Sequence, residues 1–267
     1  MKKISILGCG WLGLPLAKSL ISKGFSVKGS TTSEAKLAIL ESANIQAYSI
    51  RLTENEVIGN LKAFLSESEI LIIDIPPKLR GDGSENFVAK IETLIPFIKE
   101  SMVNHVIFIS STSVYADDNT IVTENSQPEP DTESGRQLLA TEKLLQANTN
   151  FQTTVIRFGG LIGANRHPIH FLAGRKNLEN PEAPINLIHL DDCIGIIEAV
   201  ITQNTKGEVF NAVAPYHPSR KDYYTQKTIA LGLPLPEFEE GNISVGKRID
   251  SEKIARVLNY SFIKPEL

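Results

Sequence analysis

A glycine-rich hexapeptide near the start of the chain constrains the fold more than any other feature. Gly8, Gly10 and Gly13 have the spacing GxGxxG between an apolar run at 3–8 and an amphipathic segment at 11–23. In such a strand–turn–helix unit the first glycine permits a tight turn, the second lets a pyrophosphate approach, and the third allows close helix packing. The N–H groups at the helix start then face the anion. The hexapeptide predicts a dinucleotide site; a purely structural turn is the alternative.

Apolar runs alternate with helical-period segments through residues 1–162, which predicts parallel strands joined by right-handed helical crossovers. Near-continuous hydrophobicity in most of the strands indicates helices on both faces of the sheet. We therefore expect an α/β fold with a Rossmann-type doubly wound parallel sheet. The predicted strands are 3–8, 26–30, 46–50, 69–75, 105–110 and 153–158, and the predicted helices are 11–23, 34–42, 57–66, 85–99 and 135–146.

This regular alternation ends after Phe158. A polar stretch at 163–183, long for a loop, precedes a strand-like run at 185–190 and a helix that begins near Asp191. A strand at 208–213 and helices at 219–231 and 251–258 complete the chain. We predict an NAD(P)-binding domain over 1–162 and, mainly over 163–267, a small C-terminal substrate lobe interleaved with the sheet domain.

Composition limits the class of protein. A chain of 267 residues with 42% hydrophobic content can bury a sizeable core, and its net charge of -4 lacks the basic bias of nucleic-acid binders. Two cysteines, Cys9 and Cys193, cannot build a disulfide framework. The start resembles a signal peptide, but glycines interrupt it and no apolar run reaches the roughly 18 residues that span a membrane. We expect a cytoplasmic protein that binds neither nucleic acid nor membrane.

The end of the second predicted strand bears on the choice of dinucleotide. Sites for NAD usually place an acidic residue there, where it accepts a hydrogen bond from the ribose 2′-hydroxyl. This chain has Ser30, Thr31 and Thr32, followed by Lys36, and no carboxylate that would repel a 2′-phosphate. The sequence therefore favours NADP over NAD, although Ser33 also fits the N-cap of the next helix.

Further motifs extend along nearly the whole chain. They are IFISSTSVY at 107–115, SGR at 134–136, RFGGL at 157–161, GANRHP at 163–168, IHLDD at 188–192 and RIDS at 248–251. Together with the glycine motif, they resemble the extended or atypical short-chain dehydrogenase/reductases of the NAD(P)-dependent epimerase/dehydratase superfamily, in particular the YeeZ-like branch. The motifs are specific for the superfamily and less informative about the substrate.

The resemblance implies roles for individual residues. Ser111 matches the catalytic serine, which hydrogen-bonds a substrate oxygen beside the nicotinamide, and Tyr115 looks like a substrate-side aromatic, so both are candidate catalytic residues. Asp192 is expected to cap the helix that it opens. The residues expected around the cofactor are Gly8, Cys9, Gly10, Trp11, Leu12, Gly13, Ser30, Thr31, Thr32, Ile75, Pro76, Pro77, Ser110, Phe158, Gly159 and Gly160.

The Tyr-x-x-x-Lys pair of this superfamily is replaced. Gly135 and Glu142 set the helix register, so that Ser134 stands at the tyrosine position and Leu138 at the lysine position. In the superfamily the lysine lowers the phenol pKa from about 10, so that the phenol moves a proton near neutral pH. A serine is a far weaker acid and a leucine carries no charge. The replacement argues against ordinary carbonyl reduction and sugar epimerisation.

Basic residues gather after the sixth predicted strand, between 166 and 176. We interpret this stretch as a lid that is mobile without ligand and binds a phosphate, diphosphate or carboxylate; a solvated loop is the alternative. The predicted substrate contacts are Arg136, Arg166, His167 and His189, and no metal site is predicted.

Two functions stay open at this stage. The first is an oxidoreductase or epimerase that acts on a small, anionic or nucleotide-sugar substrate, which Ser111 and the basic stretch favour. The second is a non-catalytic NAD(P)-binding sensor or scaffold, which Ser134 and Leu138 favour. Binding of flavin or S-adenosylmethionine on the same fold is a weaker third alternative. Dimers are common in the superfamily, so a homodimer is compatible with the resemblance.

Overall fold

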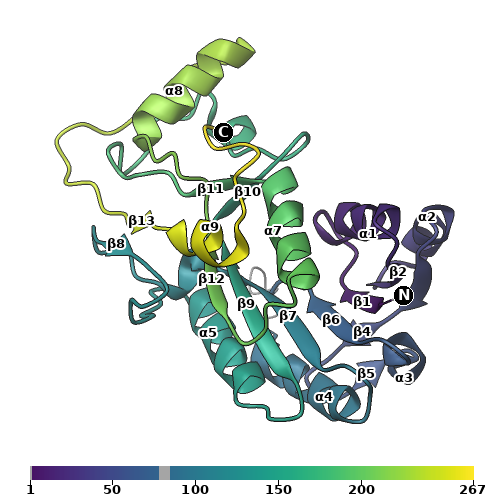
Figure 1. Ribbon diagram of the computed structural model, residues 1–267. Helices are drawn as coiled ribbons and strands as arrows, with labels where there is room; N and C mark the ends of the chain where they lie inside the picture. The colour runs from purple at the N-terminus through teal and green to yellow at the C-terminus, as the bar shows by residue number, and fades with distance from the viewer. Residues whose placement is uncertain (1, 78–84) are drawn as a thin grey trace.

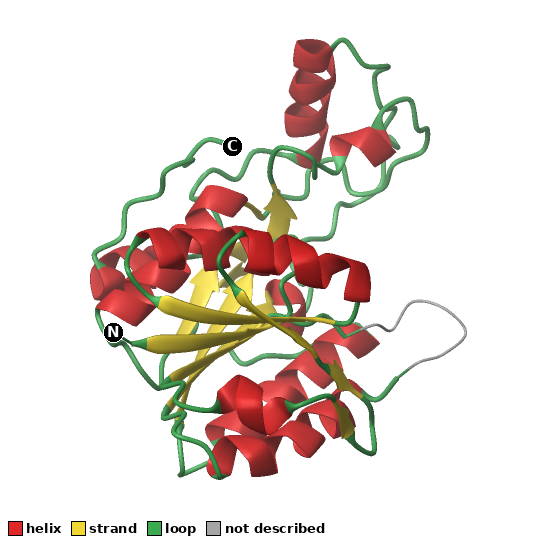
Figure 2. Ribbon diagram, turned by 90° about the vertical axis from the view of Figure 1, so that its right-hand side faces the viewer, coloured by secondary structure: helices red, strands yellow, loops and turns green. Residues whose placement is uncertain are grey.

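The computed structural model describes residues 2–77 and 85–267, and these form a parallel sheet with helices on both faces (Figures 1 and 2). Within these residues the main sheet has seven strands in the order β12-β9-β7-β6-β1-β2-β3. Their bounds are β1 Lys3–Leu7, β2 Ser26–Thr31, β3 Gln46–Ser49, β6 Ile70–Ile73, β7 His105–Ser111, β9 Gln152–Phe158 and β12 Val209–Ala212. The prediction of a Rossmann-type parallel sheet is confirmed.

The strand order reverses at β1, which lies between β2 and β6. From β1 the chain builds outward to β3 on one side and then, starting again at β6, outward to β12 on the other. In open α/β sheets this reversal leaves a crevice at the carboxyl ends of the neighbouring strands, where ligands bind. The glycine motif follows β1 directly and therefore lies at this crevice.

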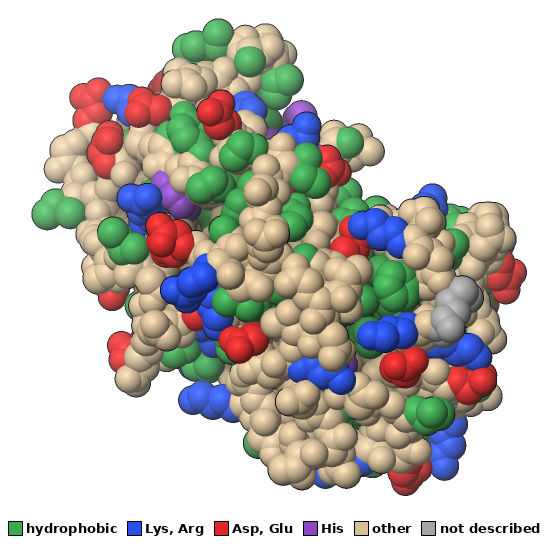
Figure 3. Space-filling model, viewed as in Figure 1, with side chains coloured by type: hydrophobic (Ala, Val, Ile, Leu, Met, Phe, Trp, Pro, Cys, Tyr) green, Lys and Arg blue, Asp and Glu red, His purple; other side chains and the backbone are tan. Residues whose placement is uncertain are grey.

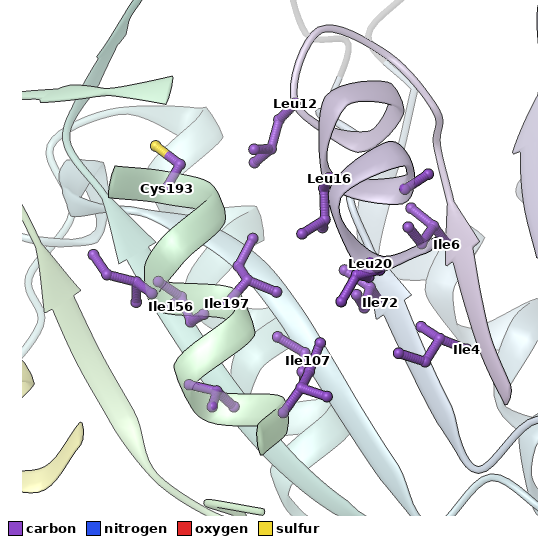
Figure 4. Packing of buried hydrophobic residues seen from close by; sticks show 14 of the residues in the cluster. Ile4, Ile6, Leu12, Leu16, Leu20, Ile72, Ile107, Ile156, Cys193 and Ile197 are labelled. Carbon is purple, nitrogen blue, oxygen red and sulfur yellow. The ribbon is translucent and has the colours of Figure 1, made fainter. Parts of the chain in front are cut away.

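Each face of the sheet packs against its own set of helices. One face carries Ile4, Ile72 and Ile156, which pack against α1 (Gly13–Ser22) and α7 (Leu190–Thr202) (Figure 4). The opposite face carries alternate residues of the same strands, and it packs against α3 (Leu61–Leu65), α4 (Phe87–Lys99) and α5 (Glu133–Gln146). Burial on both faces explains why the strands are almost continuously apolar.

Two predicted elements differ from the structure near the third strand. The predicted helix 57–66 starts instead as β5 (Val57–Ile58), which pairs antiparallel with β4 (Arg51–Leu52), and only its second half is helical, as α3. Gly59 has a φ of +112°, which breaks a helix, and the Asn60 side chain then caps α3 by accepting from the N–H of Ala63. The predicted helix 34–42 begins as a 3-10 turn (Glu34–Lys36) and continues as α2 (Leu37–Ser42).

The last 105 residues divide between the sheet and a smaller lobe. The strand predicted at 208–213 is β12, which pairs with β9 because its fully buried Phe210 belongs to the main core. The lobe stands beyond the carboxyl ends of the strands, in the upper part of Figure 1. Outside the main sheet the chain forms β8 (Ile121–Val122), β10 (Gly160–Ile162), α6 (Ile169–Leu172), β11 (Leu187–His189), α8 (Arg220–Leu231), β13 (Arg248–Ile249) and α9 (Glu252–Leu258).

The surface carries charges of both signs. On the face shown in Figure 3, lysine and arginine side chains are interspersed with aspartate and glutamate. Among the helices of the described ranges, none combines the length and the apolar character that crossing a bilayer requires.

Candidate functional site

The glycine turn is held by close backbone contacts. Gly8 has a φ of +108°, and a Cβ there would lie 2.2 Å from the carbonyl oxygen of Asp74. A Cβ on Gly13 would lie 2.2 Å from the carbonyl oxygen of Gly8. A Cβ on Gly10, in contrast, would meet no atom within 4 Å. Two of the glycines are therefore required by packing, whereas Gly10 faces open space, as a residue beneath a bound pyrophosphate must.

A pocket of about 580 Å³ opens beside Gly10, at the point where the strand order reverses. Its volume lies in the range of small-molecule and cofactor sites. The residues that line it come from the ends of β1, β2 and β6, from the 3-10 turn after β2, from the segment after β3, and from the start of α4 and the residue two positions before it. They are Leu7, Gly8, Cys9, Gly10, Ser30, Thr31, Thr32, Lys36, Ile50, Arg51, Leu52, Thr53, Asp74, Ile75, Pro76, Glu85, Phe87 and Lys90.

Half of the predicted cofactor residues line this pocket. The others do not: Leu12 and Phe158 are buried in the main core, and the hydroxyl of Ser110 donates to the carboxylate of Glu142. The remaining residues outside the lining are Trp11, Gly13, Pro77, Gly159 and Gly160. The side chain of Ser33 makes no capping hydrogen bond to the 3-10 turn that it precedes.

Three basic residues line the pocket: Lys36, Arg51 and Lys90. No sequence motif predicted Arg51 or Lys90. Lys36 and Arg51 are exposed, and neither forms an ion pair with any residue in the described ranges. Lys90 pairs with Glu85. Arg51 lies two residues after β3, so its approach to the end of β2 depends on strand pairing that the sequence does not state.

Asp74 places a carboxyl at the glycine turn. Burial raises its pKa to about 7, and both the N–H of Gly13, which donates to it, and the charge of Arg166 act in the opposite direction. The carboxyl is therefore partly protonated near neutral pH. A protonated carboxyl repels a neighbouring phosphate less than a carboxylate does.

The predicted catalytic helix is α5. Gly135 packs tightly under the turn after β7, where an added Cβ would lie 2.2 Å from the carbonyl oxygen of Ser113. Ser134 is partly exposed, whereas the side chain of Leu138 is 4% exposed and belongs to the core beneath the sheet. Ser111 is partly exposed at the end of β7, and its hydroxyl oxygen accepts a hydrogen bond from the N–H of Ser113 at 3.1 Å.

A buried polar network lies behind Ser111, and it corrects the prediction for Tyr115. Arg157 donates to both carboxylate oxygens of Glu142, with a shortest distance of 2.6 Å, and to the hydroxyl of Tyr115 at 2.5 Å. The Tyr115 hydroxyl in turn donates to Asn211 at 3.0 Å. Tyr115 is 2% exposed, so it is a buried structural residue rather than a substrate-side aromatic.

The basic stretch after β10 is folded against the lobe. The N–H of Gly174 donates to Pro234 at 2.9 Å, and the N–H of Leu178 donates to Glu237 at 3.0 Å. His167 is hydrogen-bonded to the Tyr223 hydroxyl at 2.9 Å and stacked on its ring. Burial lowers the pKa of His167 to about 4. In the structure His167 therefore packs against Tyr223, and its contact with a substrate anion stays a prediction.

The start of α7 differs from the prediction. His189 caps the helix, because its Nδ1 accepts from the N–H of Asp191 at 3.2 Å. Asp192 is fully buried and accepts from the Tyr260 hydroxyl at 2.8 Å and from two backbone N–H groups near the C-terminus. The predicted capping role of Asp192 is therefore wrong. Arg136 is exposed and its Nε donates to Glu133 at 2.9 Å, within its own helix.

The parallel sheet, the glycine turn and the pocket at the strand reversal define a Rossmann-type α/β protein with a candidate ligand site at the carboxyl ends of its strands. The Escherichia coli K12 protein YeeZ is 35% identical over 270 residues, which cover 100% of this chain and 97% of YeeZ. This chain belongs to the YeeZ family. A scan against protein-family models finds no match.

Solved structures share the fold over almost the full length. A conserved protein of unknown function from Silicibacter pomeroyi has a TM-score of 0.80 and 21% identity, covering 100% of this chain and 95% of its own. The UDP-glucuronic acid 4-epimerase from Bacillus cereus, solved in complex with NAD, has a TM-score of 0.78 and 20% identity, covering 97% of this chain and 91% of its own.

Proposed function

We propose that the chain binds NADP at the glycine turn and acts as an oxidoreductase or epimerase on a small anionic substrate, with a nucleotide sugar as the leading class. The observation that carries the proposal is the pocket beside Gly10, where a Cβ would meet no atom. The solved epimerase from Bacillus cereus binds NAD on the same fold, which supports a nicotinamide dinucleotide here.

The charges around the pocket support NADP over NAD. Ser30, Thr31 and Thr32 line the pocket at the end of β2, where NAD sites carry an acid. Lys36 and Arg51 line the same pocket. A guanidinium and an ammonium beside hydroxyl groups are suited to a 2′-phosphate, because charge-assisted hydrogen bonds are the strong ones.

Gly10→Ala tests dinucleotide binding without disturbing the fold. The added methyl meets no protein atom, so the free variant should keep the melting temperature of the wild type. It would fill the space that a pyrophosphate needs, so calorimetry should show NADP affinity reduced at least about tenfold, which is about 1.4 kcal/mol. Unchanged affinity in a normally folded variant would remove the turn from the site.

Three variants test the choice of NADP. Lys36→Gln and Arg51→Gln should weaken NADP binding and leave NAD binding unchanged, since NAD has no 2′-phosphate. Each lost charge-assisted contact is worth about 1.5–3 kcal/mol, or roughly tenfold to a hundredfold in affinity. Thr31→Asp should reverse the preference. Tighter binding of NAD than NADP by the wild type would contradict the assignment.

We place the chemistry above Ser111. A bound nicotinamide supplies hydride transfer, and the partly exposed Ser111 hydroxyl would hydrogen-bond the substrate oxygen beside it. Ser134 and Leu138 stand where the superfamily has its tyrosine and lysine, so the proton must come from another group than a phenol. Ser111→Ala should therefore reduce turnover, while NADP affinity stays unchanged.

The burial of Leu138 favours a second candidate, a non-catalytic NADP-binding sensor. Its side chain belongs to a dry core, so no charged group assists proton transfer from this position. A panel of carbonyl and nucleotide-sugar substrates separates the two candidates. The sensor predicts NADP binding without turnover, and the double variant Ser134→Tyr/Leu138→Lys would then raise a weak activity. Wild-type turnover that Ser111→Ala abolishes supports the enzyme.

A further inference from the structure

A tight turn of the C-terminal half reaches the glycine turn. Gly163 and Arg166 exchange two backbone hydrogen bonds, of 2.9 and 3.0 Å. A Cβ on Gly163 would lie 2.9 Å from the Trp11 ring and 3.2 Å from the Cβ of Leu190. The turn 163–166 is therefore wedged between the glycine turn and the start of α7, which fixes where Arg166 emerges.

The Arg166 guanidinium lies over Trp11, the residue that follows Gly10. Its Cζ is 4.9 Å from the centroid of the Trp11 ring, a cation–π distance. The side chain is exposed, and within the described part of the chain it has neither an ion pair nor a hydrogen bond. This contact holds the guanidinium over the ring, and its N–H groups are available for a two-pronged contact with an anion.

Two other basic groups of the same stretch, Lys176 and His167, contact residues of the lobe. Lys176 pairs with Glu237 at 3.2 Å, and His167 contacts Tyr223. The charge of Arg166 instead acts toward the glycine turn: it opposes the effect of burial on the pKa of Asp74 and also lowers the pKa of the otherwise raised Cys193 thiol. Arg166 is therefore the cation that the lobe directs at the start of α1.

The backbone around Trp11 is prepared for the same anion. Among the described residues, no acceptor faces the N–H groups of Trp11 and Leu12. These groups form the positive end of α1, which has ten residues. A phosphate there would lie between free backbone donors on one side and the guanidinium on the other.

We propose that Arg166 binds the pyrophosphate of the dinucleotide, so that a residue of the C-terminal half completes the cofactor site. This inference rests on the proposed function, because it requires that a dinucleotide binds at the glycine turn. It assigns Arg166 to the cofactor instead of the substrate. The pyrophosphate is common to NAD and NADP, so Arg166 contributes equally to both, unlike Lys36 and Arg51.

The test compares Arg166→Gln with Arg256→Gln, an exposed arginine on α9. Calorimetry with NADP, NAD and adenosine should show a loss of about tenfold to a hundredfold for both dinucleotides in Arg166→Gln. Adenosine, which lacks phosphate, should bind equally to both variants. The salt dependence of NADP binding should also be shallower in Arg166→Gln, and Arg256→Gln should match the wild type. Arg166→Lys should recover part of the affinity.

Trp11 gives an independent readout, because it is the single tryptophan of the chain. Its emission should change when NADP binds to the wild type and should change less in Arg166→Gln. Equal dinucleotide affinities of wild type and Arg166→Gln would overturn the inference, whether or not a parallel titration shows weaker binding of UDP-glucuronic acid. If the wild type binds no dinucleotide, the proposed function itself fails.

Discussion

Removing Arg157 should be one of the most destabilising changes in this protein. Arg157→Met leaves the side chain of Glu142, 1% exposed, without the guanidinium whose Nε and Nη2 now donate to it. The 2.5 Å hydrogen bond from Ser110 would be the remaining contact of this carboxylate. Breaking a buried ion pair by removing one partner costs about 3–5 kcal/mol, because a desolvated charge stays behind.

The assay is urea and thermal unfolding of four proteins. Arg157→Met should lose about 3–5 kcal/mol of unfolding free energy, and at about 2–4 °C per kcal/mol its melting temperature should fall by roughly 6–20 °C. Glu142→Gln should cost less, since a neutral amide still accepts from Arg157. The double variant Arg157→Met/Glu142→Leu should recover much of the loss, because no charge is left buried.

The result that would refute this reasoning is a loss below about 1 kcal/mol for Arg157→Met, the range of exposed ion pairs. A double variant Arg157→Met/Glu142→Leu that loses as much as Arg157→Met alone would also contradict it. Because the same network holds the end of β7, Arg157→Met should disturb Ser111, and Tyr115→Phe should be milder since the ion pair stays intact.

Three further predictions concern single side chains. Burial raises the pKa of Asp74 to about 7, so the folded state favours the protonated form, and the contribution of this group to stability falls as pH rises from about 4 to 7. In chemical unfolding, the free energy of unfolding of Asp74→Asn should therefore rise relative to that of the wild type between pH 5 and 8. A pH-independent difference would contradict this. Leu138→Lys should lose at least about 2 kcal/mol more unfolding free energy than Leu138→Met, because it places an unpaired charge in the core; equal losses would mean that the site admits water. Asp192→Ala should release the C-terminal segment around Tyr260, because each lost hydrogen bond to the carboxylate costs about 1.5–3 kcal/mol of stability. Limited proteolysis should then cleave the C-terminus of this variant faster than that of the control Asp191→Ala. Equal cleavage of the two variants would refute the anchoring role.

Local sequence patterns located the glycine turn of the candidate site. The GxGxxG spacing after an apolar run predicts the turn at Gly8–Gly13 because each glycine answers a short-range steric demand, and the structure shows those demands at Gly8 and Gly13. The absence of an acid at 30–32 was also visible in the chain. Lys36 and Arg51 reach one pocket only because β2 pairs with β3, so the second of them could not be found from spacing.

Roles that depend on burial were the ones that sequence reasoning missed. Tyr115 has the appearance of a substrate-side aromatic until Arg157, 42 positions later, is found at its hydroxyl. His167 has the appearance of an anion ligand, and only the structure shows that its ring is hydrogen-bonded to Tyr223. In each case the partner that decides the chemistry comes from a distant element, and no local pattern encodes that pairing.

By itself, the sequence determined the parallel sheet and the place of the glycine turn in it, because strand and helix periodicity and glycine sterics act over a few residues. Only the tertiary structure decided that Glu142 and Arg157 neutralise each other behind Ser111 and that Arg166 lies over Trp11. Charge pairing and desolvation depend on distances in space between residues far apart along the chain. Those distances exist only once the sheet and the lobe have packed together.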